Sequence, residues 1–501
     1  MGQAWVRFQD VTFGYETTSR PLLEGLTCHF PVGWTGIIGG NGVGKTTILR
    51  LATGALRPQQ GRVTVPGRAI YCPQRTDDAP EQLGELVRAT EADACEIRGR
   101  LAVEEDWAGR WRTLSHGERK RAQIGVALWL KPEVLALDEP TNHIDADARA
   151  LLASALPMYA GAGLLVSHDR ELLDALCGQC LFVEPPNGVM RPGGYTEGSQ
   201  QAGREEEHRR RQRRTAKTAH ARLRREAVRR RAKASRANRD RSKHGLGAKD
   251  HDARAKIDMA RVTGRDARAG QLLSQLSGRL RQAEERLQHA RVKKVHELGV
   301  WVPEARSKRD HLFRIAAGSI PLGADRRLRF PGLAMRPDSR VALTGPNGSG
   351  KSTLIEHIVS RLNVPKGKVT YIPQEIDLES SRRALDEMRG LRRDALAHAM
   401  TVVSRLNSRP ERLLESEAPS PGEVRKLLLA RGIAEGPHLI IMDEPTNHLD
   451  LPSIECLEQA LDDCPCGLLL VSHDKRFLAR LVRTTWRIVR ESGGSRVVVG
   501  E

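Results

Sequence analysis

Long apolar runs are missing from this chain of 501 residues. No stretch approaches the ~18 consecutive apolar residues that a membrane-spanning helix needs, which argues against a membrane domain. The first residues also lack the basic start, apolar core and cleavage site of a secretory signal. These absences predict a cytoplasmic protein.

Aromatic residues and cysteines are also scarce. Phe, Trp and Tyr make up 4% of the chain, which leaves few rings on which nucleic-acid bases could stack. The eight cysteines include a CxxC pair, Cys177 and Cys180, and a CxC pair, Cys464 and Cys466, but no second pair at zinc-finger spacing. We therefore expect reduced, structural thiols, with a redox role for Cys177 and Cys180 left open.

Excess charge is absent from most of the chain and concentrated in one segment. The whole chain has a net charge of +19. Residues 201–310 hold 33 Lys and Arg against 14 Asp and Glu, so this segment accounts for the entire excess and the remainder is neutral. A localised basic segment is typical of proteins that bind nucleic-acid phosphates.

A repeat with a period of about 305 residues is the clearest feature that is present. Lys45 and Lys351 lie 306 positions apart, and Asp138 and Asp443 lie 305 apart. Further pairs at spacings of 300 or 305 are Gln74 and Gln374, Ser115 and Ser420, Glu139 and Glu444, and His168 and His473. Several separate motifs in one order predict two copies of one module.

Two glycine-rich loops carry the most specific chemistry. Residues 39–46, GGNGVGKT, and residues 345–352, GPNGSGKS, both fit the pattern GxxxxGK[ST] between an apolar run and an apolar, helical segment. Glycines in such a loop let backbone N–H groups surround phosphate oxygens, and the lysine reaches the β- and γ-phosphates. The predicted nucleotide-binding residues are Gly39, Asn41, Gly42, Gly44, Lys45, Thr46 and Thr47 in the first copy, and Gly345, Asn347, Gly348, Gly350, Lys351, Ser352 and Thr353 in the second.

Each copy also predicts a magnesium site. The hydroxyls of Thr46 and Ser352 follow the loop lysines and are the expected Mg²⁺ ligands. Asp138 and Asp443 each end a buried apolar strand, where the carboxylate can orient Mg²⁺ through water and so belongs to the nucleotide site. ATP and Mg²⁺ are therefore the expected cofactors.

Catalytic residues are predicted next to these aspartates. Glu139 and Glu444 follow them directly and are the natural bases for the attacking water. His168 and His473 lie 29 residues after the respective glutamate, each after an apolar strand, from which the imidazole could reach the γ-phosphate. Each histidine stands in a Ser-His-Asp run, which is no hydrolase triad, because a triad assembles in space.

The domain organisation follows from the repeat. Short apolar runs without alternation, such as residues 134–137 and 439–442, predict strands buried on both faces of a parallel sheet. We expect an α/β protein with two P-loop domains, residues 1–198 and 311–501, joined by a basic linker at residues 199–310.

The linker is predicted to be a helical hairpin. Residues 200–243 lack proline and are dense in helix formers, with charge nearly all the way round, so burial against a core should not hold this helix. Its tip is expected near residues 244–265. Apolar residues then recur at alternating spacings of 3 and 4, as in a coiled-coil seam, at Leu273, Leu276, Leu280, Ala283, Leu287 and Ala290. A flexible charged linker is the alternative.

These motifs resemble the ATP-binding cassette superfamily. Gln74 and Gln374 look like Q-loop glutamines, which the resemblance makes nucleotide and Mg²⁺ ligands, and Asp145 and Asp450 look like D-loop aspartates. The residues that look like the signature motifs, which bind nucleotide, are Ser115, Gly117 and Glu118 in the first copy, and Ser420, Gly422 and Glu423 in the second. The resemblance implies a monomer whose two cassettes close face to face, so that Lys45 works with Ser420 and Lys351 with Ser115.

More narrowly, the chain resembles the ABC-F class, which acts on ribosomes. Two cassettes, a Glu-Pro-Thr-Asn-His run in both, a long basic linker and residues 249–252, KDHD, carry this resemblance. It implies that the hairpin contacts rRNA and P-site tRNA near the peptidyl-transferase centre. Only 41 residues separate Gln74 from Ser115, so the arm insertion of some housekeeping members is missing, as in members that protect ribosomes from antibiotics.

Three positions depart from the family pattern. His116 and Pro421 stand where the signature motif usually has glycine. Tyr15 lies 24 residues before Gly39, as an adenine-stacking aromatic would, but the matching position in the second copy is Pro321. Unequal turnover at the two sites is therefore expected.

Three other functions compete with a ribosome-binding ATPase. A DNA-associated cassette ATPase could use the same basic charge. A tandem ATPase subunit of a membrane importer has no evident use for the linker. A nucleotide-gated scaffold without catalysis conflicts with the presence of both Glu139 and Glu444.

Overall fold

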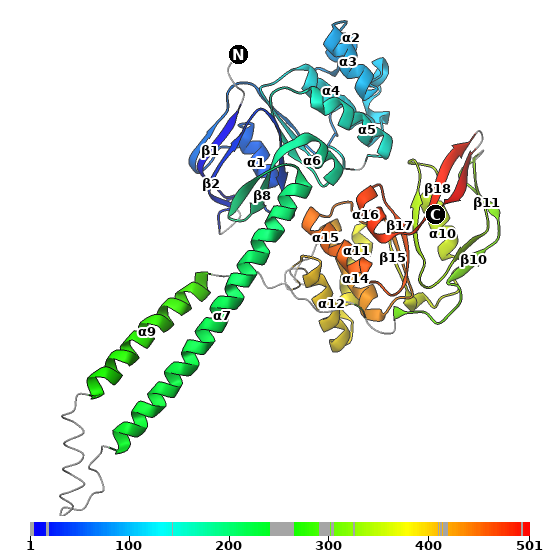
Figure 1. Ribbon diagram of the computed structural model, residues 1–501. Coiled ribbons are helices and arrows are strands. Elements are labelled where there is room, and N and C mark those ends of the chain that lie inside the picture. Colours follow the sequence, from blue (N-terminus) through cyan, green and yellow to red (C-terminus); the bar gives the residue numbers. More distant parts are fainter. Residues whose placement is uncertain are drawn as a thin grey trace, which may run out of the picture. The chain divides into compact units, whose positions relative to one another are not determined.

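The computed structural model describes residues 5–16, 20–142, 144–240, 265–289, 301, 305–323, 326–408, 410, 413, 419–491 and 494–500 (Figure 1). The chain forms two compact units. One combines Met1–Gly198 with His296–Glu501, and the other is Ser199–Val295. The predicted linker starts where the second unit starts, and its predicted end at residue 310 lies beyond this unit.

A mostly parallel sheet forms the centre of the first cassette. Its strand order is β5-β6-β7-β3-β8-β9, with only β8 and β9 antiparallel, and a smaller antiparallel sheet has the order β2-β1-β4. The strands are β1 (Val6–Phe13), β2 (Leu23–Phe30), β3 (Gly33–Ile38), β4 (Gln60–Thr64), β5 (Ala69–Cys72), β6 (Val134–Asp138), β7 (Ala162–Val166), β8 (Cys177–Glu184) and β9 (Asn187–Pro192). The helices are α1 (Lys45–Ala52), α2 (Leu83–Arg88), α3 (Ala92–Leu101), α4 (His116–Trp129), α5 (Ala146–Ala155) and α6 (Arg170–Leu176).

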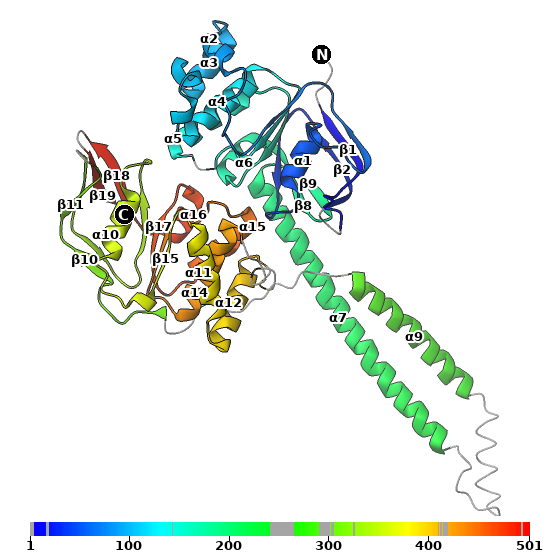
Figure 2. The same ribbon diagram turned by 180° about the vertical axis from the view of Figure 1, so that it is seen from behind.

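The second cassette repeats this plan with a larger central sheet. Its order is β11-β12-β19-β18-β14-β17-β16-β15, and β10 pairs separately with β13. The strands are β10 (Phe313–Ile315), β11 (Gly318–Pro321), β12 (Arg327–Phe330), β13 (Leu333–Met335), β14 (Arg340–Thr344), β15 (Val369–Ile372), β16 (Leu439–Asp443), β17 (Gly467–Val471), β18 (Thr484–Glu491) and β19 (Gly494–Gly500). The helices are α10 (Lys351–Val359), α11 (Leu378–Arg389), α12 (Arg393–Arg405), α14 (Pro421–Glu435), α15 (Leu451–Asp462) and α16 (Lys475–Leu481), grouped beside the strands in Figure 2.

The predicted doubly buried strands explain where the sites form. Every residue of β6, β7, β16 and β17 is buried, as expected for central parallel strands. Asp138 pairs with Val166 and Asp443 with Val471 at the carboxyl ends of these strands. Ligands of open α/β sheets bind beyond this edge, so the acidic pairs lie where a nucleotide is expected.

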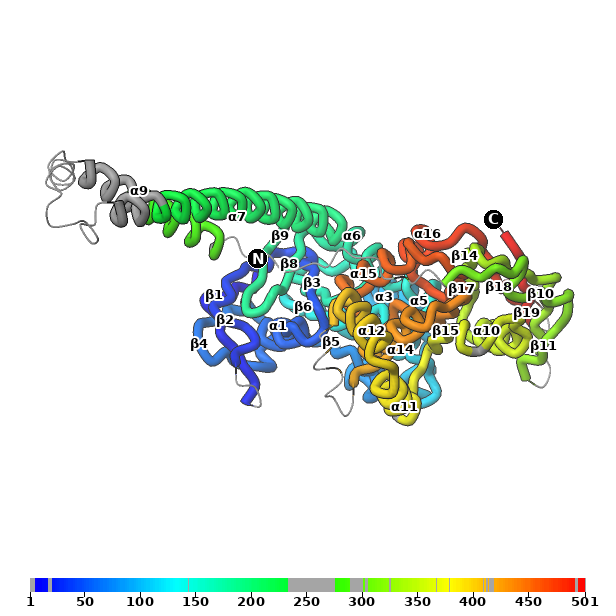
Figure 3. Tube along the Cα trace, turned by 90° about the horizontal axis from the view of Figure 1, so that it is seen from below, coloured from blue at the N-terminus to red at the C-terminus, as the bar shows by residue number. Residues whose placement is uncertain are grey.

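The second unit is a pair of long helices, α7 (Tyr195–Asp240), which begins before Ser199, and α9 (Arg265–His289). With 46 residues, α7 spans about 69 Å. The two helices run side by side in Figures 1 and 3. The predicted tip and the KDHD run at residues 249–252 lie outside the described residues.

A helical seam holds this pair together. On α9, Leu276 and Ala283 are buried, and Leu280 and Leu287 are half-buried between exposed neighbours. This is the predicted seam over the part of α9 whose side chains are described. On α7 itself, Ala227 is buried, with only 8% of it exposed. Half-buried Ala216, His220 and Leu223 precede it at spacings of 3 and 4, so small and apolar side chains form a stripe that the surrounding arginines conceal in the sequence.

Candidate active sites

The two glycine-rich loops have nearly the same backbone. Gly42 and Gly44 have φ angles of 73° and 104°, and Gly348 and Gly350 have 70° and 100°. These left-handed conformations favour glycine. They turn the loop into the amino terminus of the following helix, where an anion is stabilised by free N–H groups.

Both loop lysines point back into their own loops. Lys45 Nζ donates to the carbonyls of Gly39 and Gly40 at 2.8 and 3.1 Å. Lys351 Nζ donates in the same way to the carbonyls of Gly345 and Pro346 at 2.8 and 3.2 Å. Burial lowers the pKa of both lysines, and the nearby carboxylates oppose this shift. Each cleft therefore holds a desolvated cation that a phosphate can neutralise.

Hard oxygen ligands meet beside each lysine. Thr46 Oγ1 donates to Asp138 Oδ2 at 2.8 Å, and Ser352 Oγ donates to Asp443 Oδ2 at 3.1 Å. Tyr71 also donates to Asp138 Oδ2, at 2.9 Å. A hydroxyl with one carboxylate fits Mg²⁺, which takes few protein ligands and completes its shell with phosphates and water. Accordingly, the described residues contain no cluster of three His, Cys, Asp or Glu side chains that could hold a metal alone.

Each candidate base contacts the histidine of its own cassette. His168 Nε2 lies 2.9 Å from Glu139 Oε1, and the corresponding distance from His473 to Glu444 is 3.4 Å. Both glutamates have a φ of 48°. A left-handed conformation strains a residue with a side chain, and such strain concentrates at functional sites.

The pKa values of the two glutamates move in opposite directions. Burial would raise the pKa of Glu139, but the charge and hydrogen bonds of His168, with Lys45, outweigh burial and lower it. At Glu444, burial and the charge of Asp443 prevail and raise the pKa to about 7. Duplicated motifs therefore have unequal electrostatic surroundings.

Many of the predicted residues line two separate clefts, although Gly39, Gly345 and Asp443 are not among the lining residues. The first has a volume of about 410 Å³ and the second about 470 Å³. The first is lined by Tyr15, Asn41, Gly42, Gly44, Lys45, Thr46, Thr47, Gln74, Asp138, Glu139 and His168. The second is lined by Asn347, Gly348, Gly350, Lys351, Ser352, Thr353, Gln374, Glu444 and His473.

Residues of the second cassette complete the first cleft. Ser420, Pro421 and Gly422 line it. Ser420 begins α14 in a capping box, in which Glu423 N–H donates to Ser420 Oγ at 3.4 Å and Ser420 N–H donates to Glu423 Oε2 at 2.9 Å. Asn41 N–H donates to Asp450 Oδ2 at 2.6 Å, which joins the loop of one cassette to the aspartate of the other.

The second cleft is completed differently. The first cassette contributes Thr141, Ile144 and Arg149 to its lining. Among the described lining residues, none belongs to the first signature motif. Ser115 and Glu118 do form the same capping box at the start of α4, and Asp145 caps α5 by accepting from Ala148 N–H at 2.9 Å. Pairing of Lys351 with Ser115 stays a prediction.

Sequence comparisons show the family to which the chain belongs. The pattern of the ABC transporter family matches residues 27–142 and 330–447. The tylosin resistance ATP-binding protein TlrC of Streptomyces fradiae is 32% identical over 526 aligned residues, covering 89% of this chain and 90% of TlrC. The chain belongs to the ABC-F family. The ribosome protection protein VmlR of Bacillus subtilis is 29% identical over 89% of this chain and 80% of VmlR. The energy-dependent translational throttle protein EttA of Escherichia coli O6:H1 is 25% identical, covering 92% and 88%.

Solved structures agree in fold. A chain described as RNase-L Inhibitor covers 98% of this chain and 90% of itself with a TM-score of 0.61 at 17% identity, which shows the fold alone. The predicted family and fold class are confirmed, and this ABC-F protein is an ABC-type ATPase. Within the described residues, no helix combines the length and hydropathy that a membrane crossing requires.

The two ABC-F clefts differ at the position where Tyr15 is predicted to stack on adenine. Tyr15 OH lies 3.1 Å from Thr47 Oγ1 at the edge of the first cleft. In the second cassette, a shorter connection between β11 and β12 replaces the loop that carries this ring, and Leu322 and Arg326 line the cleft there. The deletion explains why no aromatic residue matches Tyr15.

Sequence reasoning missed two buried cations behind the Q-loops. Lys120 Nζ donates to the carbonyl of Gln74 at 3.0 Å. Arg425, 305 positions later, donates to the carbonyl of Gln374 and, at 3.1 Å, to that of Glu444. Both residues lie five positions after the signature serines, so the repeat itself was the signal that could have found them.

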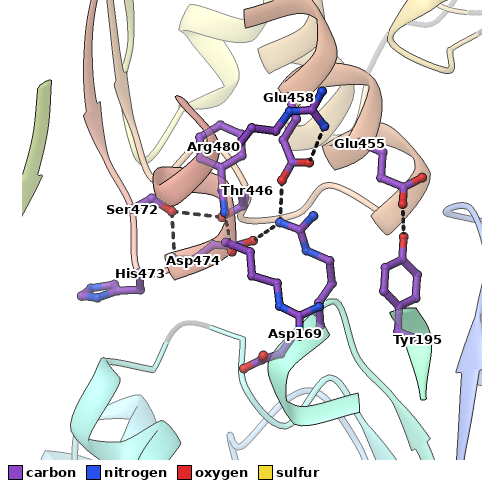
Figure 4. A network of polar contacts seen from close by, with 12 residues as sticks. Asp169, Tyr195, Thr446, Glu455, Glu458, Ser472, His473, Asp474 and Arg480 are labelled. Carbon is purple, nitrogen blue, oxygen red and sulfur yellow. Dashed lines mark hydrogen bonds and ion pairs between the residues drawn. The ribbon is translucent and has the colours of Figure 1, made fainter. Parts of the chain in front are cut away.

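Ion pairs and a hydrogen bond between side chains also join the two cassettes. Arg170 Nη2 lies 2.5 Å from Glu458 Oε1 and 3.1 Å from Asp474 Oδ2. Tyr195 OH donates to Glu455 Oε1 at 2.5 Å, and Figure 4 shows this pair beside Glu458 and Asp474. Because the Arg170 pair is almost fully buried, removing one partner should cost about 3–5 kcal/mol of stability.

Proposed function

We propose that this ABC-F ATPase binds ribosomes and uses ATP binding and hydrolysis to place its basic hairpin near tRNA and the peptidyl-transferase centre. Its task is translation control or ribosome protection against an antibiotic. The observation that carries the proposal is a highly basic pair of helices encoded between two complete sets of ATP-site residues. The relatives VmlR and EttA, whose names refer to ribosome protection and to translation, support the proposal.

The charge on α7 suits a phosphate backbone. Its five glutamates in the described side-chain range are Glu197, Glu205, Glu206, Glu207 and Glu226, and residues 208–232 carry twelve Arg and Lys against Glu226 alone. A groove of about 1060 Å³ on this helix is lined mainly by basic side chains, including Arg222, Arg225 and Arg229. Rigidly spaced guanidinium groups bind phosphates strongly and independently of sequence.

The catalytic step follows from the site geometry. Glu139 and Glu444 accept the proton of the attacking water, and His168 and His473 hold the glutamates through the contacts described above. Lys45 and Lys351 exchange their loop carbonyls for phosphate oxygens. Thr46 with Asp138, and Ser352 with Asp443, would hold Mg²⁺, and the ion would supply positive charge against the phosphates.

A ribosome co-sedimentation assay tests the proposal. The Glu139→Gln/Glu444→Gln variant should lose ATP hydrolysis and stay on ribosomes when ATP is present, because closed cassettes can no longer reopen by turnover. An ATP-free sample is the control. Failure to bind ribosomes at moderate ionic strength would refute the ribosomal role, and unchanged turnover would refute the assigned bases.

A pulldown from cell extract separates the competing functions. RNase treatment should release the protein's partners, whereas DNase should not. Release by DNase alone would favour a DNA-associated ATPase, and recovery with membranes would favour an importer subunit.

A further inference from the structure

Arg149 of the first cassette reaches the second ATP cleft. It lies in the first turns of α5, shortly after Asp145, and its side chain is 23% exposed. Its Nη1 donates to the backbone carbonyl of His473 at 3.2 Å. It also lines the cleft that contains Lys351 and Glu444. One guanidinium therefore connects α5 to the histidine loop of the other cassette.

The guanidinium is held in place from its own side. Arg149 Nε lies 3.1 Å from Asp169 Oδ2. Asp169 is itself fixed at the start of α6, where its Oδ1 accepts from Leu172 N–H at 3.1 Å. A planar guanidinium anchored at Nε presents its other nitrogens in a fixed direction. In this structure that direction leads to His473.

The charge of Arg149 acts on both candidate catalytic groups. Burial lowers the pKa of His473 to about 4, and the charges of Lys351 and Arg149 add to this shift. Arg149 also opposes the rise of the Glu444 pKa. The guanidinium of Arg149 therefore acts electrostatically on Glu444 and His473, in agreement with its contact to the His473 carbonyl.

The first cleft has no matching group. The position 305 residues after Arg149 is Ile454, which is buried in α15. Asp474, the counterpart of Asp169, pairs instead with Arg170, and it lines the second cleft rather than the first. The described lining of the first cleft contains Lys45 as its cation and no arginine. The contact is therefore specific to the second site.

We propose that Arg149 is a positioning residue supplied by the first cassette to the second ATP site, where it fixes the His473 loop and places a positive charge beside Glu444 and the terminal phosphate. This inference rests on the proposed roles of Glu444 and His473. Because the guanidinium belongs to the other cassette, the second site is complete only while the two cassettes are together. Hydrolysis there depends directly on cassette pairing.

The test isolates each site with a glutamate variant. In a Glu139→Gln background, which leaves the second site active, Arg149→Ala should lower kcat about tenfold or more, with KM for ATP within about twofold. Arg149→Lys retains the charge without the fork and should recover part of this loss. In a Glu444→Gln background, which leaves the first site active, Arg149→Ala should change kcat by less than about twofold.

Tyr195→Phe is the control for a merely structural effect. It removes the hydrogen bond to Glu455, which joins the cassettes and whose two residues line neither cleft, so it should affect both backgrounds alike. Equal losses from Arg149→Ala in the two backgrounds, or no loss in the Glu139→Gln background, would overturn the inference. Turnover that persists in the double Gln variant would instead refute the proposed bases, which is a different failure.

Discussion

Lowering the pH from 8 to 6 should slow the second ATP site about tenfold and leave the first almost unchanged. Glu444, the proposed base of the second site, has a pKa of about 7, because burial and Asp443 raise it more than Lys351, the His473 N–H and Arg149 lower it. A general base acts in its ionised form, so activity is lost as the pH falls through this pKa. The pKa of Glu139 is lowered below its ordinary value, so this base stays ionised throughout the range.

The magnitude follows from the fraction ionised. With a pKa of about 7, the Glu444 carboxyl is about 90% ionised at pH 8 and about 10% at pH 6. A base whose pKa lies below about 4.5 changes by only a few per cent over the same range. His473, with a pKa of about 4, stays neutral and adds no titration of its own.

The assay measures kcat at saturating ATP and constant ionic strength, from pH 5.5 to 8.5. The Glu139→Gln variant reports the second site and the Glu444→Gln variant reports the first. The first variant should show an acid limb near pH 7 that the second lacks. Parallel pH profiles would refute the electrostatic difference between the sites. An acid limb near pH 7 in the Glu444→Gln variant alone would refute the causes assigned to the two pKa shifts.

Three further changes test other parts of the structure. Tyr15→Ala should raise KM for ATP about fivefold or more in the Glu444→Gln background and leave the Glu139→Gln background unchanged, because base stacking on a ring contributes about 1–3 kcal/mol. Gly422→Ala should abolish turnover in the Glu444→Gln background, since the added Cβ would lie 2.6 Å from the carbonyl oxygen of His448. Gly117→Ala meets its nearest atom at 3.6 Å, so it should leave the melting temperature unchanged. The groove on α7 contains Arg222, Arg225 and Arg229. Changing all three to Gln should reduce the slope of log ribosome affinity against log salt concentration by about 2–3, whereas changing them to Lys should preserve this slope.

The motif residues were predictable because their chemistry fixes their spacing. A phosphate loop must follow a strand and begin a helix, so GxxxxGK[ST] places Lys45 and Lys351 without a structure. Asp138 and Asp443 were equally clear, since each ends a fully buried strand. The α9 seam was visible from its leucine spacing alone.

Other features depend on contacts that no local pattern records. The α7 stripe of Ala216, Leu223 and Ala227 is hidden because small side chains give little apolar signal among many arginines. Lys120 and Arg425 look like surface charges on an amphipathic helix, and only the fold places them under the Q-loop carbonyls. Burial of a charged head group is invisible until its partners are in place.

Unequal sites arise in this ABC-F protein although its motifs are duplicated. Each cleft combines residues of one cassette with residues of the other, so a change outside the motifs alters one site only. Asp450 reaches the first loop through Asn41, whereas Arg149 reaches the second site through His473. Because position 454 is isoleucine, the charge that Arg149 places beside Glu444 has no equivalent beside Glu139. Two matching motif sets therefore predict two nucleotide sites, but equal rates would require matching residues at the contacts between cassettes as well.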